Sequence, residues 1–456
     1  MREIFFSADR LVAALLNLPK EKNVCLLDSC GAGHLDSHLL IAGFNPVEIM
    51  EITGTDADKT LEILNRKLSA ENLFAIFTLA YDFGLKLENI QPRPKEFSNF
   101  DEPDIFLALF DCLIIHDYDA RKTFLIGDEN KFDRIQHILS GSPRFPGFPD
   151  TQNSKISSNF SEENYIAAVE KIKERIRRGD TYQTNLTRQI RAELPENLTP
   201  GQIFRHLRKN HPAPFAALLH RKNDTVISAS PERFFSIAEC GTQDTEFSAR
   251  RKRVITTSPI KGTRPRGKTV EEDLRLKQEL INSEKDRAEN VMIVDLLRND
   301  LGRICKFGSI RVEKLCELQQ HPTFFHLVST VSGELPAEIS FSEIIKAVFP
   351  CGSITGAPKI RTMQIIDEIE TAPRALSMGA IGYSIRNLRN TALDSPLSTL
   401  HSFDLSVAIR TMVIRGREAI FNVGGGIVID SVAEREYEET ITKTRALLSA
   451  IRGKFT

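Results

Sequence analysis

The sequence predicts an α+β fold, because strand-like apolar runs and amphipathic helices are mixed along the chain. Of its 456 residues, 41% are hydrophobic and 27% are charged. That composition is typical of a globular protein that buries a large core, and the length suggests two or three domains. The formal net charge is −1, so the charge balance does not indicate a nucleic-acid or anionic-membrane partner.

The cysteine pattern favours a reducing compartment. No two cysteines form a CxxC pair and their number is odd, which argues against a disulfide framework and a zinc ribbon. The N-terminal apolar run at residues 11–18 predicts a small helix, not a signal peptide. No apolar stretch approaches the ~18 residues that a membrane span needs. We therefore expect a cytoplasmic protein. The seven cysteines are at positions 25, 30, 112, 240, 305, 316 and 351.

A boundary between two regions is predicted near residues 140–163. This segment is rich in Pro, Gly, Ser and Asn and has few periodic apolar residues, which is typical of a linker. We expect an N-terminal region at 1–150 and a second region at 160–456. Apolar runs predict strands in the first region at 23–28, 74–81 and 105–118, the last buried on both faces. No catalytic group of residues is evident there.

The second region combines helices and strands. An amphipathic helix is predicted at 162–178, ended by Gly179, and a last helix at 433–451. The polar, basic stretch 233–258 predicts an extended hairpin or a loop, and residues 405–414 and 418–423 predict a hairpin around 415–416. Three pairs of residues have the spacing of helix N-terminal capping boxes: Thr269 with Glu272, Ser283 with Asp286, and Ser340 with Glu343.

Three glutamates are placed so that they can share a cation. Glu436 and Glu439 are three residues apart on the last predicted helix, so they lie on one face. Glu289 lies beside the apolar run 291–294 of a helix predicted at 286–301, where a carboxylate needs a partner. A solvated acidic helix start is the alternative. Oxygen ligands from several glutamates suit Mg²⁺.

Two glycine-containing segments are ambiguous. Residues 349–370 turn through Gly352 and Gly356 and then begin a helix at Pro358. Its N-terminal amides, with Lys359 nearby, indicate either an anion site or a plain turn and helix cap, and no Walker loop follows. The triple glycine at 424–426 fits either a hairpin exit or close approach of the backbone to a ligand.

Lys261 is a candidate nucleophile. It lies between Pro259 and Gly262, with Arg264 and Arg266 close by. Neighbouring cations and burial favour the neutral amine that a nucleophilic lysine needs. Taken alone, a further basic residue in a basic loop is the better interpretation.

Seven segments occur in one order along the second region: PIKGTRPRG (259–267), DRAENVMIVDLLRNDLGR (286–303), FHLVST (325–330), GSITGAPK (352–359), GAIGYS (379–384), AIRT (408–411) and GGGIVIDSVAEREYEET (424–440). In order and spacing they resemble the chorismate-binding enzymes over residues 160–452. The resemblance continues more weakly upstream at 26–29, 81–84 and 103–105. It implies a chorismate-binding α/β sandwich, with two packed β-sheets and helices outside, and Mg²⁺ as cofactor.

The resemblance also implies roles for individual residues. Glu289, Glu436 and Glu439 would hold Mg²⁺, Glu232 would be the general acid and base at the departing C4 hydroxyl, and Lys261 would add covalently at ring C2. Substrate-binding positions would be Gln183, His326, Thr355, Tyr383, Arg410, Gly424, Gly425, Gly426 and Lys443. Among these, Arg410 is the natural guanidinium fork for the enolpyruvyl carboxylate.

Two positions separate the members of this family. Isochorismate and salicylate synthases carry a water-activating lysine where this chain has Gln183, and anthranilate synthases usually have alanine where it has Lys261. Aminodeoxychorismate synthases have that lysine. The resemblance therefore implies amination of chorismate at C4, on the route to p-aminobenzoate and folate, with anthranilate synthesis as the alternative. Since no glutaminase motif is evident, ammonia is expected from a glutamine amidotransferase partner.

Overall fold

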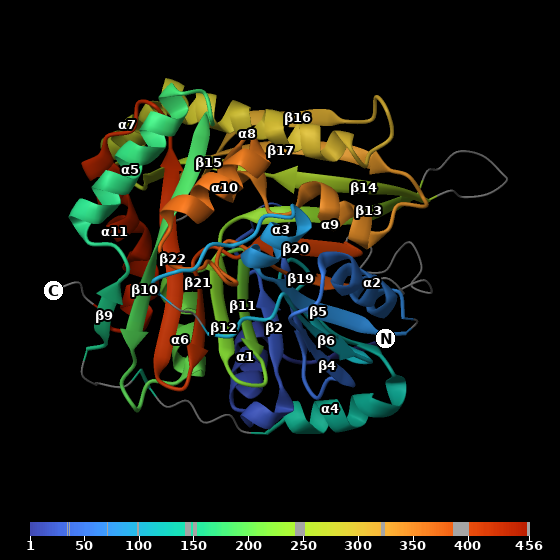
Figure 1. Ribbon diagram of the computed structural model, residues 1–456. Helices are drawn as coiled ribbons and strands as arrows, with labels where there is room; N and C mark the ends of the chain where they lie inside the picture. Colours follow the sequence, from blue (N-terminus) through green and yellow to red (C-terminus); the bar gives the residue numbers. More distant parts are fainter. Residues whose placement is uncertain are drawn as a thin grey trace.

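Two large antiparallel β-sheets pack against each other and carry helices on their outer sides (Figure 1). The computed structural model describes residues 1–33, 35, 37–70, 72–97, 100–141, 147–148, 153–241, 251–320, 324–385 and 401–453. Among these residues, no helix is both long and apolar enough to cross a membrane. The predicted α+β sandwich is confirmed.

The first sheet has 12 strands among the described residues. In spatial order they are β1 (Arg2–Ile4), β8 (Lys122–Gly127), β7 (Cys112–Asp117), β3 (Leu39–Gly43), β2 (Cys25–Asp28), β11 (Phe215–His220), β12 (Thr225–Ser230), β21 (Thr411–Arg415), β22 (Glu418–Ile427), β10 (Gln183–Glu193) and β18 (Gly356–Ala357), with β9 (Lys155–Ser158) paired to β10. The long β10–β22 ladder forms the part of this sheet that matters for the candidate site.

The second sheet has 10 strands within the described ranges. Their order is β15 (Ile260–Pro265), β17 (Phe324–Leu335), β14 (Arg251–Ser258), β13 (Arg233–Gly241), β20 (Phe403–Val407), β19 (Ala380–Ser384), β5 (Phe74–Leu79), β6 (Ile105–Phe110) and β4 (Glu48–Ile52), with β16 (Arg311–Gln320) on β17. The polar stretch 233–258 therefore contains the expected hairpin, as β13 and β14.

Apolar side chains are buried in layers. One cluster lies between the sheets and includes Cys25, Ile76, Phe106 and Val413. The outer face of the first sheet packs against α1 (Ala8–Leu16), α4 (Phe132–Leu139), α6 (Pro200–Asn210) and α11 (Ala433–Ala450). The outer face of the second packs against α2 (Ala57–Leu68), α3 (Tyr81–Leu87), α8 (Glu284–Gly302) and α9 (Phe341–Val348). Around β10 lie α5 (Glu162–Arg177) and α10 (Lys359–Ile369), and α7 (Val270–Ile281) packs on β15.

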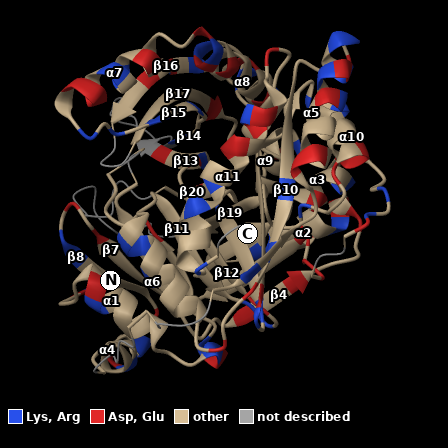
Figure 2. Cartoon of the chain, turned by 90° about the vertical axis from the view of Figure 1, so that its left-hand side faces the viewer, with Lys and Arg blue, Asp and Glu red and all other residues tan. Residues whose placement is uncertain are grey.

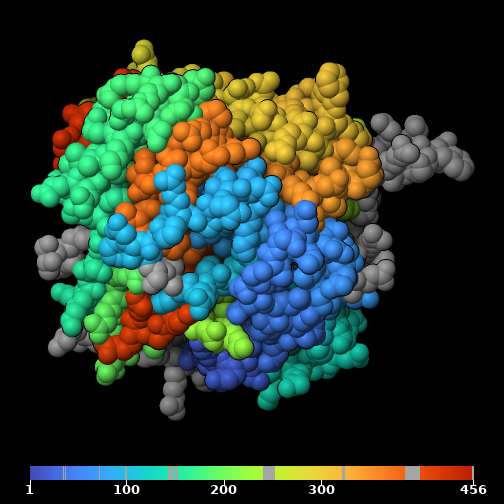
Figure 3. All heavy atoms as spheres, in the orientation of Figure 1, coloured from blue at the N-terminus to red at the C-terminus, as the bar shows by residue number. Residues whose placement is uncertain are grey.

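Strands from both predicted regions are neighbours within each sheet. β2 of the first region pairs with β11 of the second, and β5 pairs with β19. In the space-filling view, segments from the beginning, middle and end of the chain adjoin on one face (Figure 3). The division at residues 150–160 therefore stays a prediction about the chain, while the sheets themselves are continuous across it.

Two predicted strands are wrong because the chain changes sheets within them. Residues 105–118 form β6 in the second sheet and β7 in the first, joined at Asp111. Residues 405–414 belong to β20 and β21, again in different sheets, and Arg410 between them has φ 48°. A non-glycine residue in the left-handed region cannot continue a strand. The hairpin of β21 and β22 is confirmed.

The predicted helix starts are largely confirmed. The side chains of Thr269, Ser283 and Ser340 each accept a hydrogen bond from the backbone three residues on, and the last forms a full capping box with Glu343. The helices carry both signs of charge, as α5 and α7 show in Figure 2, in keeping with the net charge of −1. Six cysteines are free thiols: Cys25, Cys30, Cys112, Cys305, Cys316 and Cys351.

Candidate active site

The triple glycine lies on β22, where backbone and side chains approach closely. Gly426 pairs with Asn185 and Gly424 with Thr187 of β10. A Cβ atom at residue 424 would lie 1.9 Å from the backbone oxygen of Leu186, and one at residue 426 would lie 2.2 Å from Nε2 of Gln183. Any larger residue would therefore clash, so the glycines serve close approach and not a hairpin exit.

Lys261 reaches the same place from the second sheet. Gly262 has φ 82° and coincides with a register shift between β15 and β17. The Nζ atom of Lys261 donates a hydrogen bond to the backbone oxygen of Ser353 at 3.3 Å and lies 3.6 Å from the position of a Cβ at Gly426. Lys261 is thus adjacent to Gln183, which the sequence places 78 positions away in a different sheet.

Glu232 follows β12 and is only 5% exposed. Burial raises the pKa of its carboxyl group, opposed by the hydroxyl of Ser353 and by the nearby charge of Lys261. Among the described residues, its Oε1 has no hydrogen-bond partner. A raised pKa favours the protonated carboxyl group that a general acid needs.

Asn185, which was not among the predicted site residues, belongs to the same group. Its Oδ1 and the Oε1 of Gln183 are both buried without a hydrogen-bond partner in the described chain. We call Gln183, Asn185, Glu232 and Lys261 the Lys261 end of the site. The signal that could have identified Asn185 is its position two residues after Gln183, on the same face of a strand.

The three predicted metal ligands lie on two helices. Glu289 is on α8, whereas Glu436 and Glu439 are on α11. The ammonium of Lys285 lies 3.5 Å from Oε1 of Glu436 and 3.9 Å from Oε1 of Glu289. A cationic group thus already stands between these two carboxylates. We call the three glutamates the carboxylate end of the site.

Local charges and burial set the pKa values at the carboxylate end. Burial raises the pKa of Glu289, partly offset by Lys261 and Lys285. Burial also acts on Glu439, but the ammonium of Lys443, 2.6 Å away, holds the pKa of that carboxyl below its ordinary value. Lys443 also donates to the backbone oxygen of Gly424 at 2.9 Å, which joins this end to the glycines.

The three carboxylates fit a hard divalent cation in chemistry, since all offer oxygen. A Cβ at Gly425 would lie 3.4 Å from both Oε2 of Glu436 and Oε1 of Glu439. Their ligand atoms, however, do not all come within 4.8 Å of one another. The set that meets this spacing in the described part of the chain is His38, Asp117 and Asp119. The arrangement is therefore that of carboxylates neutralised by lysines.

Two further predicted residues, His326 and Thr355, lie near the Lys261 end. His326 on β17 shares a 2.8 Å hydrogen bond with Thr263, two residues from Lys261. The hydroxyl of Thr355 donates to the backbone oxygen of Cys351, and its own carbonyl accepts from Asn185. Arg410 lies at the turn between β20 and β21, and burial lowers the pKa of its guanidinium. No carboxylate of the described residues forms an ion pair with it, as a guanidinium awaiting an anionic ligand requires.

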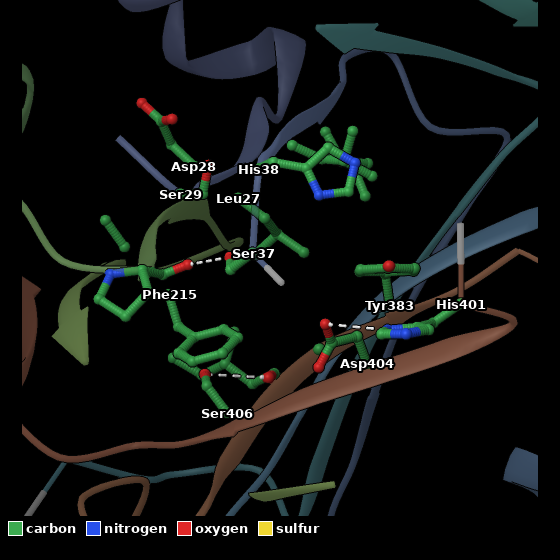
Figure 4. A pocket seen from close by; sticks show the side chains of 16 residues that line it. Leu27, Asp28, Ser29, Ser37, His38, Phe215, Tyr383, His401, Asp404 and Ser406 are labelled. Carbon is green, nitrogen blue, oxygen red and sulfur yellow. Dashed lines mark hydrogen bonds and ion pairs between the residues drawn. The ribbon is translucent and has the colours of Figure 1, made fainter. Parts of the chain in front are cut away.

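Tyr383 lies elsewhere, in a pocket between the sheets. It points into this pocket with His38, His401 and Asp404 (Figure 4). None of the lining residues belongs to the Lys261 end or the carboxylate end. Tyr383 is on β19, and its face of that strand packs into the core between the sheets. The structure therefore does not bring it together with the other predicted substrate-binding residues.

Lys359, next to the candidate anion site at residues 352–358, has its charge bound within the protein. Lys359 is only 9% exposed, and its Nζ lies 2.6 Å from Oδ2 of Asp300 on α8 and 3.1 Å from the backbone oxygen of Val348. Its charge is thus used to join α10 to the helix that carries Glu289. A buried lysine is stable when paired in this way.

Arg374 fixes the backbone behind the site. It is 2% exposed and pairs with Glu370, while Nη1 donates to the oxygen of Ile354 and Nη2 to that of Asn185. One guanidinium therefore holds both the loop that carries Ser353 and the strand that carries Gln183. Such fixed surroundings pre-organise a site.

An enclosed group of a lysine, several carboxylates and an arginine, at the edge of two packed sheets, is typical of an enzyme for a small anionic substrate. The family model described as "chorismate binding enzyme" matches residues 22–449. The chain belongs to this family of chorismate-binding enzymes.

Individual relatives belong to more than one activity class. The chain is 36% identical to aminodeoxychorismate synthase component 1 of Bacillus subtilis, over 83% of this chain and 76% of that protein. It is 37% identical to anthranilate synthase component 1 of Aquifex aeolicus, over 76% and 68%. The crystal structure of anthranilate synthase component I from Streptococcus pneumoniae superposes with a TM-score of 0.73 at 27% identity, covering 98% of this chain and all of that one.

Proposed function

We propose that this enzyme aminates chorismate at C4 to give 4-amino-4-deoxychorismate, for p-aminobenzoate and folate synthesis. The observation that carries the proposal is the position of Lys261, whose Nζ lies beside Gln183 and Gly426, with Glu232 close by. A nucleophilic amine and a protonated carboxyl group are the two groups that replacement of a ring hydroxyl requires.

The first step forms a covalent intermediate. The neutral amine of Lys261 bonds to ring C2, the two ring double bonds shift by one position, and the C4–O bond breaks. The departing hydroxide takes the proton of Glu232 and leaves as water. Burial raises the pKa of Glu232, which favours the protonated form that this role requires.

The second step releases the lysine. The lone pair of ammonia forms a bond to C4, the double bonds shift back, and the C2–N bond breaks with its electron pair returning to Lys261. The new C4 ammonium group then gives a proton to the carboxylate of Glu232. The sum is replacement of the C4 hydroxyl by an amine, with water as the other product.

The remaining predicted residues have binding roles in this proposal. Arg410 would pair with the enolpyruvyl carboxylate, with His326, Thr355, Lys443 and the glycines 424–426 around the ring. Glu289, Glu436 and Glu439 would hold Mg²⁺, which would bind the ring carboxylate and neutralise its charge. Lys285 and Lys443 would have to move away from these carboxylates when the cation binds.

Ammonia would come from a glutamine amidotransferase partner. The named relatives are component 1 of their synthases, which implies a second component. Several described thiols, among them Cys25 and Cys351, are buried, and burial raises their pKa, whereas a glutaminase nucleophile needs an accessible thiolate.

A second candidate function is anthranilate synthesis, because the identity to the Aquifex aeolicus relative is as high as that to the Bacillus subtilis one. The purified chain with chorismate, Mg²⁺ and ammonium, plus excess aminodeoxychorismate lyase, should form p-aminobenzoate only when the lyase is present. Anthranilate formed without the lyase would overturn the proposal in favour of the second candidate.

The Lys261→Ala variant tests the covalent step. We expect it to lose C4 amination by about a thousandfold or more, because it lacks the nucleophile. Lys268→Ala, a change of another lysine just beyond β15, serves as the control and should retain activity. Mass spectrometry of the wild type with chorismate should find an adduct on Lys261. A fully active, adduct-free Lys261→Ala enzyme would contradict the mechanism.

A further inference from the structure

We infer that Asn185 binds the attacking ammonia, together with Gln183. The inference rests on the proposed function only in taking ammonia as the nucleophile. Its basis is two buried oxygens that lack hydrogen-bond partners in the described part of the chain. The Oε1 of Gln183 and the Oδ1 of Asn185 are without a hydrogen bond among the described residues, although the residues are only 2% and 8% exposed. Leaving a buried acceptor unpaired is costly, so a ligand is the expected partner.

The two amides share one face of β10, because residues two apart on a strand point the same way. Asn185 pairs directly with Gly426. Directly opposite residues of an antiparallel pair also point to one side, so the space over Gly426, which has no side chain, lies beside Asn185. The Nε2 of Gln183 fills that space, 2.2 Å from the position of a Cβ at Gly426, and the Nζ of Lys261 lies 3.6 Å from the same position. A ligand held by the oxygens of the two amides would therefore lie close to Lys261, the proposed nucleophile.

The backbone of Asn185 is fixed on both sides. Its N–H donates to the oxygen of Thr355 at 2.8 Å, and its oxygen accepts from Nη2 of Arg374 at 2.7 Å. Both partners are buried. The backbone position of the Asn185 side chain is therefore fixed, as is needed in a group that positions a small molecule.

The chemistry of two acceptor oxygens favours ammonia over water. Ammonia has three N–H donors, so it can bond to both oxygens and still direct its lone pair at the ring. It attacks without prior loss of a proton. Water needs a base for that attack, and the amide side chains of Asn185 and Gln183 are not bases. The pair thus provides binding for a neutral amine and no activation for water.

The test is the dependence of the rate on ammonium concentration. Asn185→Leu has a similar volume but no acceptor, so the apparent KM for ammonia should rise about tenfold or more while the KM for chorismate changes less than about threefold. Asn185→Asp keeps an acceptor oxygen, so its apparent KM for ammonia should lie between those of the wild type and Asn185→Leu. Thr184→Val, which removes a buried hydroxyl from the other face of β10, is the control and should leave the ammonia KM unchanged.

A second measurement separates binding of ammonia from binding of chorismate. Without ammonium, the Asn185→Leu enzyme should still form the chorismate adduct on Lys261. Loss of that adduct, or an unchanged KM for ammonia, would overturn the inference. If the wild type consumes chorismate at a rate independent of ammonium, the proposed function itself fails, whatever the variant does.

Discussion

The two ends of the site differ in how far their polar groups are satisfied. At the carboxylate end, Lys285 lies within 4 Å of both Glu289 and Glu436, and Lys443 pairs with Glu439. At the Lys261 end, oxygens of Gln183, Asn185 and Glu232 have no partner among the described residues. One end is thus neutralised by cations of the chain, and the other is left with open hydrogen-bonding positions.

This difference matches the ligands that the two ends would receive. A divalent cation can replace lysine ammonium groups, because both neutralise carboxylates. A neutral nucleophile and a departing hydroxyl group must instead find unoccupied acceptors and a proton donor. The unpartnered atoms of the Lys261 end are therefore more informative about the reaction than the paired charges of the carboxylate end.

Among the variants that test this comparison, Glu232→Gln should have the largest effect, because it removes the proton donor of the Lys261 end. The variant cannot give a proton to the departing hydroxyl group, so kcat should fall by about 10²–10⁴-fold. Because burial raises the pKa of Glu232, the wild-type rate should fall as pH rises through that pKa, and this limb should vanish in the variant. Glu239→Gln, an exposed carboxylate on β13, is the control. An unchanged pH profile would exclude Glu232 as the acid.

The sequence predicted most of the elements that carry the site, because local patterns determine them. The helix of Glu436 and Glu439 and the start of α8 follow from periodicity and capping. The changes of sheet at Asp111 and Arg410 do not, since both flanking strands are apolar and only the tertiary fold decides which sheet each one joins.

The site itself was predicted unevenly. Lys261 and Glu232 lie together, as the family resemblance implies, whereas Tyr383 points into a different pocket because of the face of β19 on which it lies. Asn185 was missed because no strand was predicted at 183–193, so its shared face with Gln183 could not be recognised. Its importance depends on which hydrogen bonds remain unmade, and that follows only from the packing of Thr355 and Arg374 around it.

Asp82→Asn tests the buried network behind the Lys261 end, with an intermediate effect on stability. Asp82 accepts a hydrogen bond from the backbone of Ala375 at 2.9 Å, next to Arg374, and burial raises its pKa to about 6. The folded state therefore binds the proton of Asp82 more tightly than the unfolded chain does, and this contribution to stability is lost as pH rises through about 6.

An asparagine does not ionise, so the variant should be more stable than the wild type by about 2 kcal/mol at pH 8, and the difference should shrink towards pH 4.5. Urea unfolding at the two pH values measures it. Asp58→Asn, an exposed carboxylate on α2, should show no such pH-dependent gain. An equal stability difference between variant and wild type at both pH values would mean that ionisation of Asp82 does not cause the difference.

Lys285→Met tests the carboxylate end and should have the smallest effect of these variants, a modest change in Mg²⁺ affinity. Lys285 competes with a cation for Glu289 and Glu436, but its side chain is 51% exposed, so its pairing is weak. Removing it should tighten Mg²⁺ binding about two- to fivefold in calorimetric titration without chorismate. Arg298→Met removes the same charge from a distant turn of α8 and should leave the affinity unchanged. Weaker Mg²⁺ binding in Lys285→Met would mean that the lysine supports the cation site and does not stand in for the cation.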